Sequence, residues 1–105
     1  MLFSPEIHEP LDQRSWSGDA ARAAIRGIAA DCEASFDSPY WPVHPRDVDG
    51  DEAAGPWTTL YLGSAGVVYA LDLLVRRGLV DGIRDYFPAL EQALERERVL
   101  AAASE

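Results

Sequence analysis

Lysine is absent from this 105-residue chain, and all nine basic residues are arginines. Without lysine there is no Schiff-base chemistry, no pyridoxal anchor and no phosphate-loop lysine. The single cysteine, Cys32, excludes an internal disulfide and is typical of a reducing compartment. The net charge of −9, from 18 acidic and nine basic residues, disfavours nucleic acid and anionic membranes as partners.

A targeting signal and a membrane span are also missing from the pattern. Met1-Leu2-Phe3 is followed by Ser-Pro-Glu, without a basic region or a sustained apolar run. The longest apolar stretch, residues 67–75, is interrupted by Asp72 and is too short to cross a bilayer. We therefore expect a cytoplasmic protein with no membrane partner.

What the chain does contain is helical periodicity, with no strand alternation and no internal repeat. A hydrophobic content of 48% argues for a folded chain, and 105 residues allow one domain at most. The pattern predicts an all-α fold of antiparallel helices with a long Pro-rich acidic loop. The expected parts are an irregular arm (1–17), a helix (18–36), a Pro/Asp-rich loop (37–59), a buried helix (60–78) and a third helix (82–102).

The first and third helices each have a predicted apolar face. Ser17 or Asp19 can cap the first helix. Pro88 can occupy a first turn but not an unkinked interior, so the third helix either kinks at Phe87 or follows a short stub from residue 88. The predicted apolar positions are Ala21, Ile25, Ile28, Ala29, Cys32 and Phe36 in the first helix, and Ile83, Phe87, Leu90 and Leu94 in the third.

The helix at 60–78 is apolar on nearly every side, so other helices must enclose it. Glycine costs about 1 kcal/mol relative to alanine inside a helix, so Gly66 needs a reason at the level of the backbone. Gly63, Gly66 and Ala70 form a stripe without bulk, where a neighbouring backbone can come close. Gly78 stands where a left-handed cap ends a helix. Because 105 residues cannot cover this helix fully, we expect a longer protein, a second chain or self-association.

Each candidate site has a structural interpretation that competes with the functional one. Cys32 on an apolar face is expected to pack as a small hydrophobe. Cys32, His8 and His44 have the atom types of a zinc site but not its close spacing. Tyr61 and Tyr69 are eight residues apart and are interpreted as core residues rather than as a pair. Gly63-x-x-Gly66 is not a nucleotide motif, because no strand precedes it and a third glycine is missing.

The acidic stretch 47–52 resembles the start of a calcium loop. Asp47, Asp49 and Asp51 occupy positions 1, 3 and 5, but position 6 is Glu52 instead of glycine and position 12 is Thr58 instead of glutamate. This pattern favours a solvated acidic loop, with weak calcium binding left as the alternative.

The segment Leu60-Tyr61-Leu62-Gly63-Ser64-Ala65-Gly66 resembles the phrase that opens inner helices in the LanC-like (lanthionine synthetase C-like) family. The resemblance covers about residues 20–80. It includes Trp57-Thr58-Thr59 before the phrase, Arg76-Arg77-Gly78-Leu79 after it, and Phe36-Asp37 and Trp41-Pro42-Val43-His44-Pro45 upstream.

The resemblance implies the N-terminal helices of an α/α toroid. Full-length relatives add a thiol to dehydrated serine or threonine and form a thioether, with zinc held by two cysteines and a histidine late in the chain. No ligand or catalytic residue transfers to this sequence, so we expect no catalytic, metal or cofactor residue within it. The expected function is therefore a scaffold segment that is not catalytic by itself. The alternative is an acidic helical module that self-associates or binds a partner through 60–78.

Overall fold

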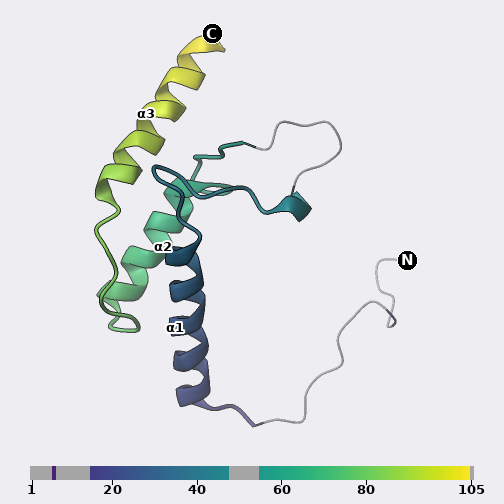
Figure 1. Ribbon diagram of the computed structural model, residues 1–105, viewed down its shortest axis with the longest axis vertical. Coiled ribbons are helices and arrows are strands. Elements are labelled where there is room, and N and C mark those ends of the chain that lie inside the picture. Colours follow the sequence, from purple (N-terminus) through teal and green to yellow (C-terminus); the bar gives the residue numbers. More distant parts are fainter. Residues whose placement is uncertain (1–5, 7–14, 48–54, 105) are drawn as a thin grey trace.

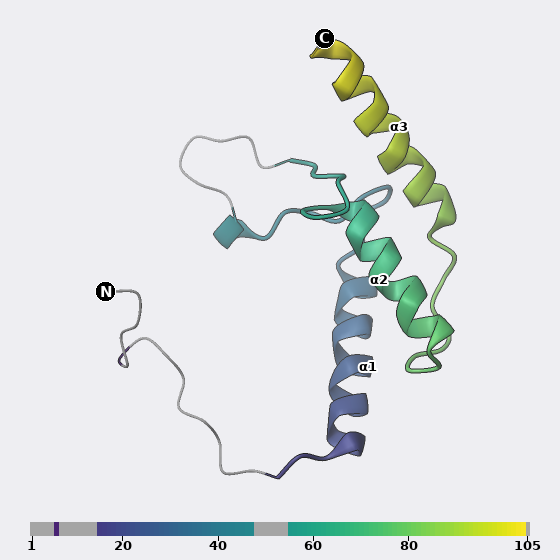
Figure 2. The ribbon, with the colours of Figure 1, turned by 180° about the vertical axis from the view of Figure 1, so that it is seen from behind.

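The computed structural model describes residue 6 and residues 15–47 and 55–104. Over these ranges the chain forms helices and no strand, which confirms the all-α prediction. The helices are α1 (Gly18–Ala34), the 3₁₀ turn η2 (Pro45–Asp47), α2 (Ser64–Arg76) and α3 (Phe87–Ala103). Successive α-helices run in opposite directions, and α2 lies between α1 and the start of α3 (Figures 1 and 2).

Helix α1 begins where the sequence predicts. The Ser17 hydroxyl accepts a hydrogen bond from the backbone N–H of Ala20 at 3.1 Å, which satisfies a donor that the first turn leaves free. The helix ends at Ala34, two residues before the predicted end. Phe36 leaves the helix because its ring packs against Trp41, with 4.6 Å between the ring centroids.

The connection that follows α1 is packed against the helices by Trp41. The indole Nε1–H of Trp41 donates to the Cys32 carbonyl at 2.7 Å, and its backbone N–H donates to the Ser64 hydroxyl at 3.1 Å. These two bonds join the end of α1 to the start of α2. Trp41 is buried and Trp57 is half-buried, so both tryptophans pack this connection against the rest of the chain.

Helix α2 begins at Ser64, and the prediction of a helix from Leu60 is wrong. The preceding segment folds back over the first turn, where the Ser64 N–H donates to the Trp57 carbonyl at 3.0 Å. A Cβ on Gly66 would lie 2.0 Å from the Leu60 carbonyl oxygen, and one on Gly63 would lie 2.2 Å from the Trp57 carbonyl oxygen. The glycines therefore admit a close backbone, as predicted, and this backbone is the chain's own.

Helix α2 ends at Arg76, before the predicted residue 78. Gly78 adopts a φ of +70°, its N–H donates to the Val75 carbonyl, and the Leu79 N–H donates to the Leu74 carbonyl. This pair of bonds is a Schellman motif, which satisfies carbonyls at the helix end and needs a left-handed residue. The predicted glycine cap is confirmed.

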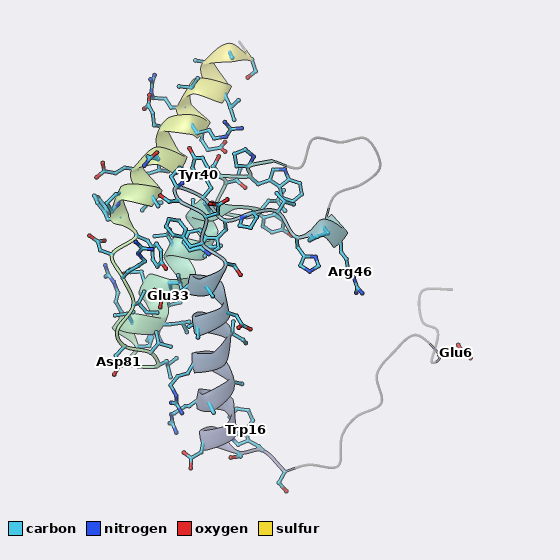
Figure 3. The ribbon with its side chains drawn as sticks, in the orientation of Figure 1. Glu6, Trp16, Glu33, Tyr40, Arg46 and Asp81 are labelled. Atoms are coloured by element: carbon cyan, nitrogen blue, oxygen red, sulfur yellow. The ribbon has the colours of Figure 1, made fainter. Side chains whose placement is uncertain are left out.

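Helix α3 begins at Phe87, and neither a helix from 82 nor a stub before Pro88 forms. The Arg84 N–H and the Tyr86 hydroxyl both donate to Glu33 Oε2 of α1, at 3.2 and 2.9 Å. These bonds hold the preceding residues in a non-helical conformation. Figure 3 shows Glu33 on the side of α1 that faces this segment.

The buried face of α3 differs from the predicted stripe. Ala89 and Ala93 are buried, whereas Phe87 and Leu94 are exposed and Leu90 is half-buried. Small side chains allow α3 to pack closely on α2, and this close packing turns the larger residues toward the edge of the contact. The core cluster is made of Ala29, Trp41, Val68, Leu71, Val80 and Tyr86.

Candidate functional site

A groove with a volume of about 720 Å³ lies between α2 and α3. Its lining combines faces of the two helices, on which residues three and four apart form a stripe, with the non-helical segments 58–60 before α2 and 83–86 before α3. The α2 wall comprises Ala65, Val68, Tyr69, Leu71, Asp72, Val75 and Arg76, and the α3 wall comprises Phe87, Leu90, Leu94 and Glu97. Figure 1 shows that α2 and α3 lie close to each other near their starts and run apart from there, α2 toward the start of α1 and α3 away from it.

The groove exposes large apolar side chains. Tyr69 is 63% exposed, Phe87 59% and Leu94 56%, and Leu60 and Val75 are also exposed. Scattered apolar residues are normal at a protein surface, but these five line one concave surface. Such a surface is typical of a site that receives another apolar element.

One ion pair and two hydrogen bonds to carboxylates border the groove. Asp72 and Arg76, one turn apart on α2, form an ion pair at 2.8 Å. Asp85 Oδ1 accepts a hydrogen bond from the Phe87 N–H at 2.9 Å, next to the start of α3. Further along α3, the Glu97 carboxylate accepts a hydrogen bond from the buried Thr58 hydroxyl. This last bond ties the loop before α2 to the middle of α3.

An aromatic cluster reaches the groove through Tyr86. The Tyr86 ring packs against Phe36 and Trp41, each at 5.0 Å between centroids, and Arg84 lies over the Phe36 and Tyr86 rings. Burial, reinforced by the hydrogen bond to the Glu33 carboxylate, raises the pKa of Tyr86 to about 12. Tyr86 therefore stays protonated near neutral pH and acts as a donor that links α3 to α1.

A second hollow, of about 490 Å³, lies where the loop segments meet the start of α2. Trp41, Trp57 and Tyr61 contribute its aromatic surface, and His44 contributes a polar edge. The His44 Nδ1 atom accepts a hydrogen bond from the Arg46 N–H at 3.1 Å. Figure 3 shows Arg46 on the part of the loop that extends away from the helices.

Cys32 packs against the core cluster, as its position on an apolar face predicts. Burial, and next the negative charge of Glu33, raise the pKa of its thiol, so the reactive thiolate is disfavoured. Within residue 6 and residues 15–47 and 55–104, no three His, Cys, Asp or Glu side chains gather as metal ligands. These residues do not fit the zinc of full-length LanC-like proteins.

Several predicted site residues lie outside the described residues. His8, Asp49, Asp51 and Glu52 belong to this group, so the structure tests neither the zinc combination with His8, which the spacing disfavours, nor the preference for a solvated acidic loop over weak calcium binding at 47–52.

The interpretation of Tyr61 and Tyr69 as core residues is wrong. Tyr61 is 92% exposed, because residues 60–63 form a turn outside the helix rather than its first turn. Tyr69 lines the groove, on the side of α2 that α3 leaves open.

The bond between Thr58 and Glu97 was not predicted from the sequence. The signal available was weak, since neither residue stands in a recognisable motif and 39 positions separate them. Phe87 and Leu94 were identified as apolar but were assigned to the buried side of the third helix.

Comparisons with protein-family models, with curated proteins and with solved structures found no match. The LanC-like resemblance therefore rests on the residues of the glycine phrase and its flanks. Among the described residues, no helix combines the length and the apolar character that crossing a membrane requires.

Proposed function

We propose that this chain is a helical scaffold segment that further polypeptide completes, in the manner of the N-terminal helices of a LanC-like toroid. It positions helices and carries out no catalysis by itself. The thioether chemistry belongs, in this proposal, to residues of a longer protein. A cytoplasmic location is part of the same proposal.

The observation that carries the proposal is the apolar groove between α2 and α3. A chain that folded only for its own stability would be expected to cover Tyr69, Phe87 and Leu94, yet more than half of each side chain is exposed. The groove is bounded by α2, by α3 and by the segments 58–60 and 83–86, and its exposed apolar side chains form a surface on which a further helix packs.

The position of α2 supports the toroid interpretation. In a ring of paired helices an inner helix is covered from both sides, and here α2 has α1 on one side and the start of α3 on the other (Figures 1 and 2). Gly63 and Gly66 allow the segment 57–60 to pack against the first turn of α2. The glycines that carry the LanC-like resemblance therefore have a structural role in this chain. That role requires no ligand.

Self-association is the alternative proposal, and the same exposed groove supports it. Two copies could pack their α2 and α3 faces together as a four-helix arrangement. The net charge of −9 on each copy opposes this association through repulsion.

The test of the scaffold proposal compares the 105-residue chain with a chain extended along its reading frame past Glu105. Hydroxyl-radical labelling followed by mass spectrometry measures the reactivity of Tyr69 and Phe87. We expect their labelling to fall severalfold in the extended chain, because added helices cover the groove.

Trp16 is the internal control, since it is 85% exposed and lies at the start of α1, away from the groove (Figure 3). Its labelling should change little. Unchanged labelling of Tyr69 and Phe87 in the extended chain, or a stop codon immediately after Glu105, contradicts the proposal.

A further inference from the structure

The hollow of about 490 Å³ lies on a different face of α2 from the α2–α3 groove. The α2 residues that line it are Ser64, Gly66, Val67 and Ala70, and none of them lines the groove. Its other walls come from the non-helical segments 41–44 and 57–63. Figures 1 and 2 show the segments that lead to η2 and to α2 leaving the helices on the same side.

These two segments form one packed surface. A Cβ on Gly55 would lie 2.7 Å from the Cγ2 atom of Val43, so the chain before α2 runs directly against the chain before η2. The Trp41 N–H also donates to the Ser64 hydroxyl at 3.1 Å, which joins the first segment to α2. The hollow is therefore bounded by elements that hold one another in place.

Aromatic rings supply much of the surface of the hollow. Tyr61 is 92% exposed, because it stands in the turn before α2, and Trp57 is half-buried. The faces of such rings pack well against flat apolar groups, and the polar tips of tyrosine and tryptophan remain able to form hydrogen bonds.

The free hydrogen-bonding side chains of the hollow are mainly donors. His44 Nδ1 accepts from the Arg46 N–H at 3.1 Å, so the neutral imidazole carries its hydrogen on Nε2. Within the described part of the chain, the Trp57 Nε1–H donates to no acceptor. The Ser64 hydroxyl already accepts from Trp41. A ligand rich in acceptors therefore complements this surface.

The lining of the hollow contains no acidic residue and no arginine, although the chain has 18 acids. A charged ligand would lose water here without gaining an opposite charge. A neutral sugar is also a poor match, because its hydroxyl groups need acceptors and this lining offers mainly donors.

A proline-rich segment has the complementary chemistry. Proline lacks an N–H, so such a segment presents carbonyl acceptors and apolar pyrrolidine rings. In the polyproline II conformation these carbonyls form no internal hydrogen bonds and stay free for a partner. Grooves lined by aromatic residues are the surfaces on which such segments dock.

We propose that the hollow at the start of α2 binds a proline-rich segment in the polyproline II conformation. The rings of Trp57 and Tyr61 pack against pyrrolidine rings, and the Trp57 Nε1–H and His44 Nε2–H donate to carbonyls of the ligand. This binding function goes beyond the scaffold role and uses a different face of α2.

The experiment uses a fluorescein-labelled ten-residue peptide with eight consecutive prolines between terminal glycines. A matched peptide of alternating glycine and serine has the same length and charge but is flexible. Fluorescence anisotropy measures binding to the 105-residue chain. We expect the proline peptide to bind at least about tenfold more tightly, with little change as salt is added, because no charges meet. Equal binding of the two peptides overturns the proposal.

Ring variants locate the site. Tyr61→Ser should weaken the proline peptide at least about fivefold, whereas Tyr61→Phe should keep most of the binding because it keeps the ring. Tyr69→Ser is the matched control, since Tyr69 is also exposed but lines the α2–α3 groove instead. Equal losses from Tyr61→Ser and Tyr69→Ser overturn the assignment of the hollow.

A donor variant tests the hydrogen bonds. Trp57→Phe keeps an aromatic ring and removes the Nε1–H, so it should weaken binding about three- to tenfold. Trp16→Phe is the control, because Trp16 is 85% exposed at the start of α1 and should have no effect. Far-UV circular dichroism confirms that each variant keeps its helices. Equal affinities of Trp57→Phe and Trp16→Phe contradict the donor role of Trp57.

Two further outcomes would identify a different occupant. If cellohexaose, a neutral oligosaccharide, changes the tryptophan fluorescence and the proline peptide does not bind, the ligand is a sugar and the inference is overturned. If sedimentation shows a dimer that Tyr61→Ser dissociates, the occupant is a second copy and the inference is likewise wrong. The labelling test of the scaffold proposal reads Tyr69 and Phe87 in the α2–α3 groove, so either proposal can fail alone.

Discussion

At the scale of single residues, Gly63 and Gly66 are required because they carry no side chain. The backbone of 57–60 passes so near α2 that any side chain at Gly66 would overlap the Leu60 carbonyl. Gly27, in the middle of α1, has nothing within 4 Å of its missing Cβ. The same residue type is therefore required at one position and carries a helix-propensity cost at the other.

Opposite effects on stability are expected from alanine at these two glycines. Gly66→Ala should lower the free energy of unfolding by about 1–3 kcal/mol, because a backbone segment must move. Gly27→Ala should raise it by about 0.5–1 kcal/mol, because alanine is the better helix former at an unobstructed site. Urea denaturation followed at 222 nm measures both. A stability loss at Gly27 equal to that at Gly66 would contradict the close-approach argument.

At the scale of elements, α3 is held by contacts that its own periodicity does not reveal. Ala93 is 0% exposed, so the α2–α3 contact depends on a small side chain. Tyr86 bonds to Glu33 of α1, and Glu97 bonds to Thr58 of the loop before α2. These contacts place the apolar residues of α3 along the edge of the contact and create the groove.

Enlarging Ala93 should therefore separate the two helices. Ala93→Leu is expected to lower the free energy of unfolding by about 1–3 kcal/mol, because the added atoms enter a filled contact. Ala102→Leu is the control, since Ala102 is exposed in the last turns of the same helix. Chemical denaturation of the two variants provides the comparison, and a neutral Ala93→Leu would show that α3 is not closely packed on α2.

At the scale of the whole molecule, one hydroxyl connects distant parts of the chain. Tyr86 contacts rings from the loop after α1 and donates to Glu33 on α1 itself. Its pKa rises from 10.0 to about 12 on folding, chiefly through burial. Between these values the unfolded chain releases this proton before the folded chain does. Folding stability therefore falls as pH rises through this window, and below it the contribution of Tyr86 is fully present and does not change with pH.

The expected result is a loss of stability between about pH 10 and about pH 12 that depends on Tyr86. Tyr86→Phe should be less stable near neutral pH, because it lacks the bond to Glu33, but should lose less on going to high pH. The raised pKa of Cys32 acts in the same direction and persists in the variant. Urea unfolding at a series of pH values tests this, and parallel pH profiles for the two proteins would argue against the Tyr86 assignment.

Local patterns predicted the parts of the fold that depend on neighbours in sequence. The Ser17 cap, the Gly78 terminus and the absence of strands follow from spacings of a few residues. The excess apolar surface of the 60–78 segment pointed to a covering element. It did not reveal that α3 would form the other wall of the groove.

The sequence alone determined that this chain is helical, that it is strongly acidic and that its glycine phrase admits a close backbone. Tertiary structure alone decided where α2 and α3 begin and which residues remain exposed. The physical reason is the range of the interactions involved. Glu33 bonds to Arg84 and Tyr86 across 51 and 53 positions, and these bonds override the local preference of residues 82–86. The hydrophobic periodicity of a single helix carries no information about contacts between residues so far apart in the sequence.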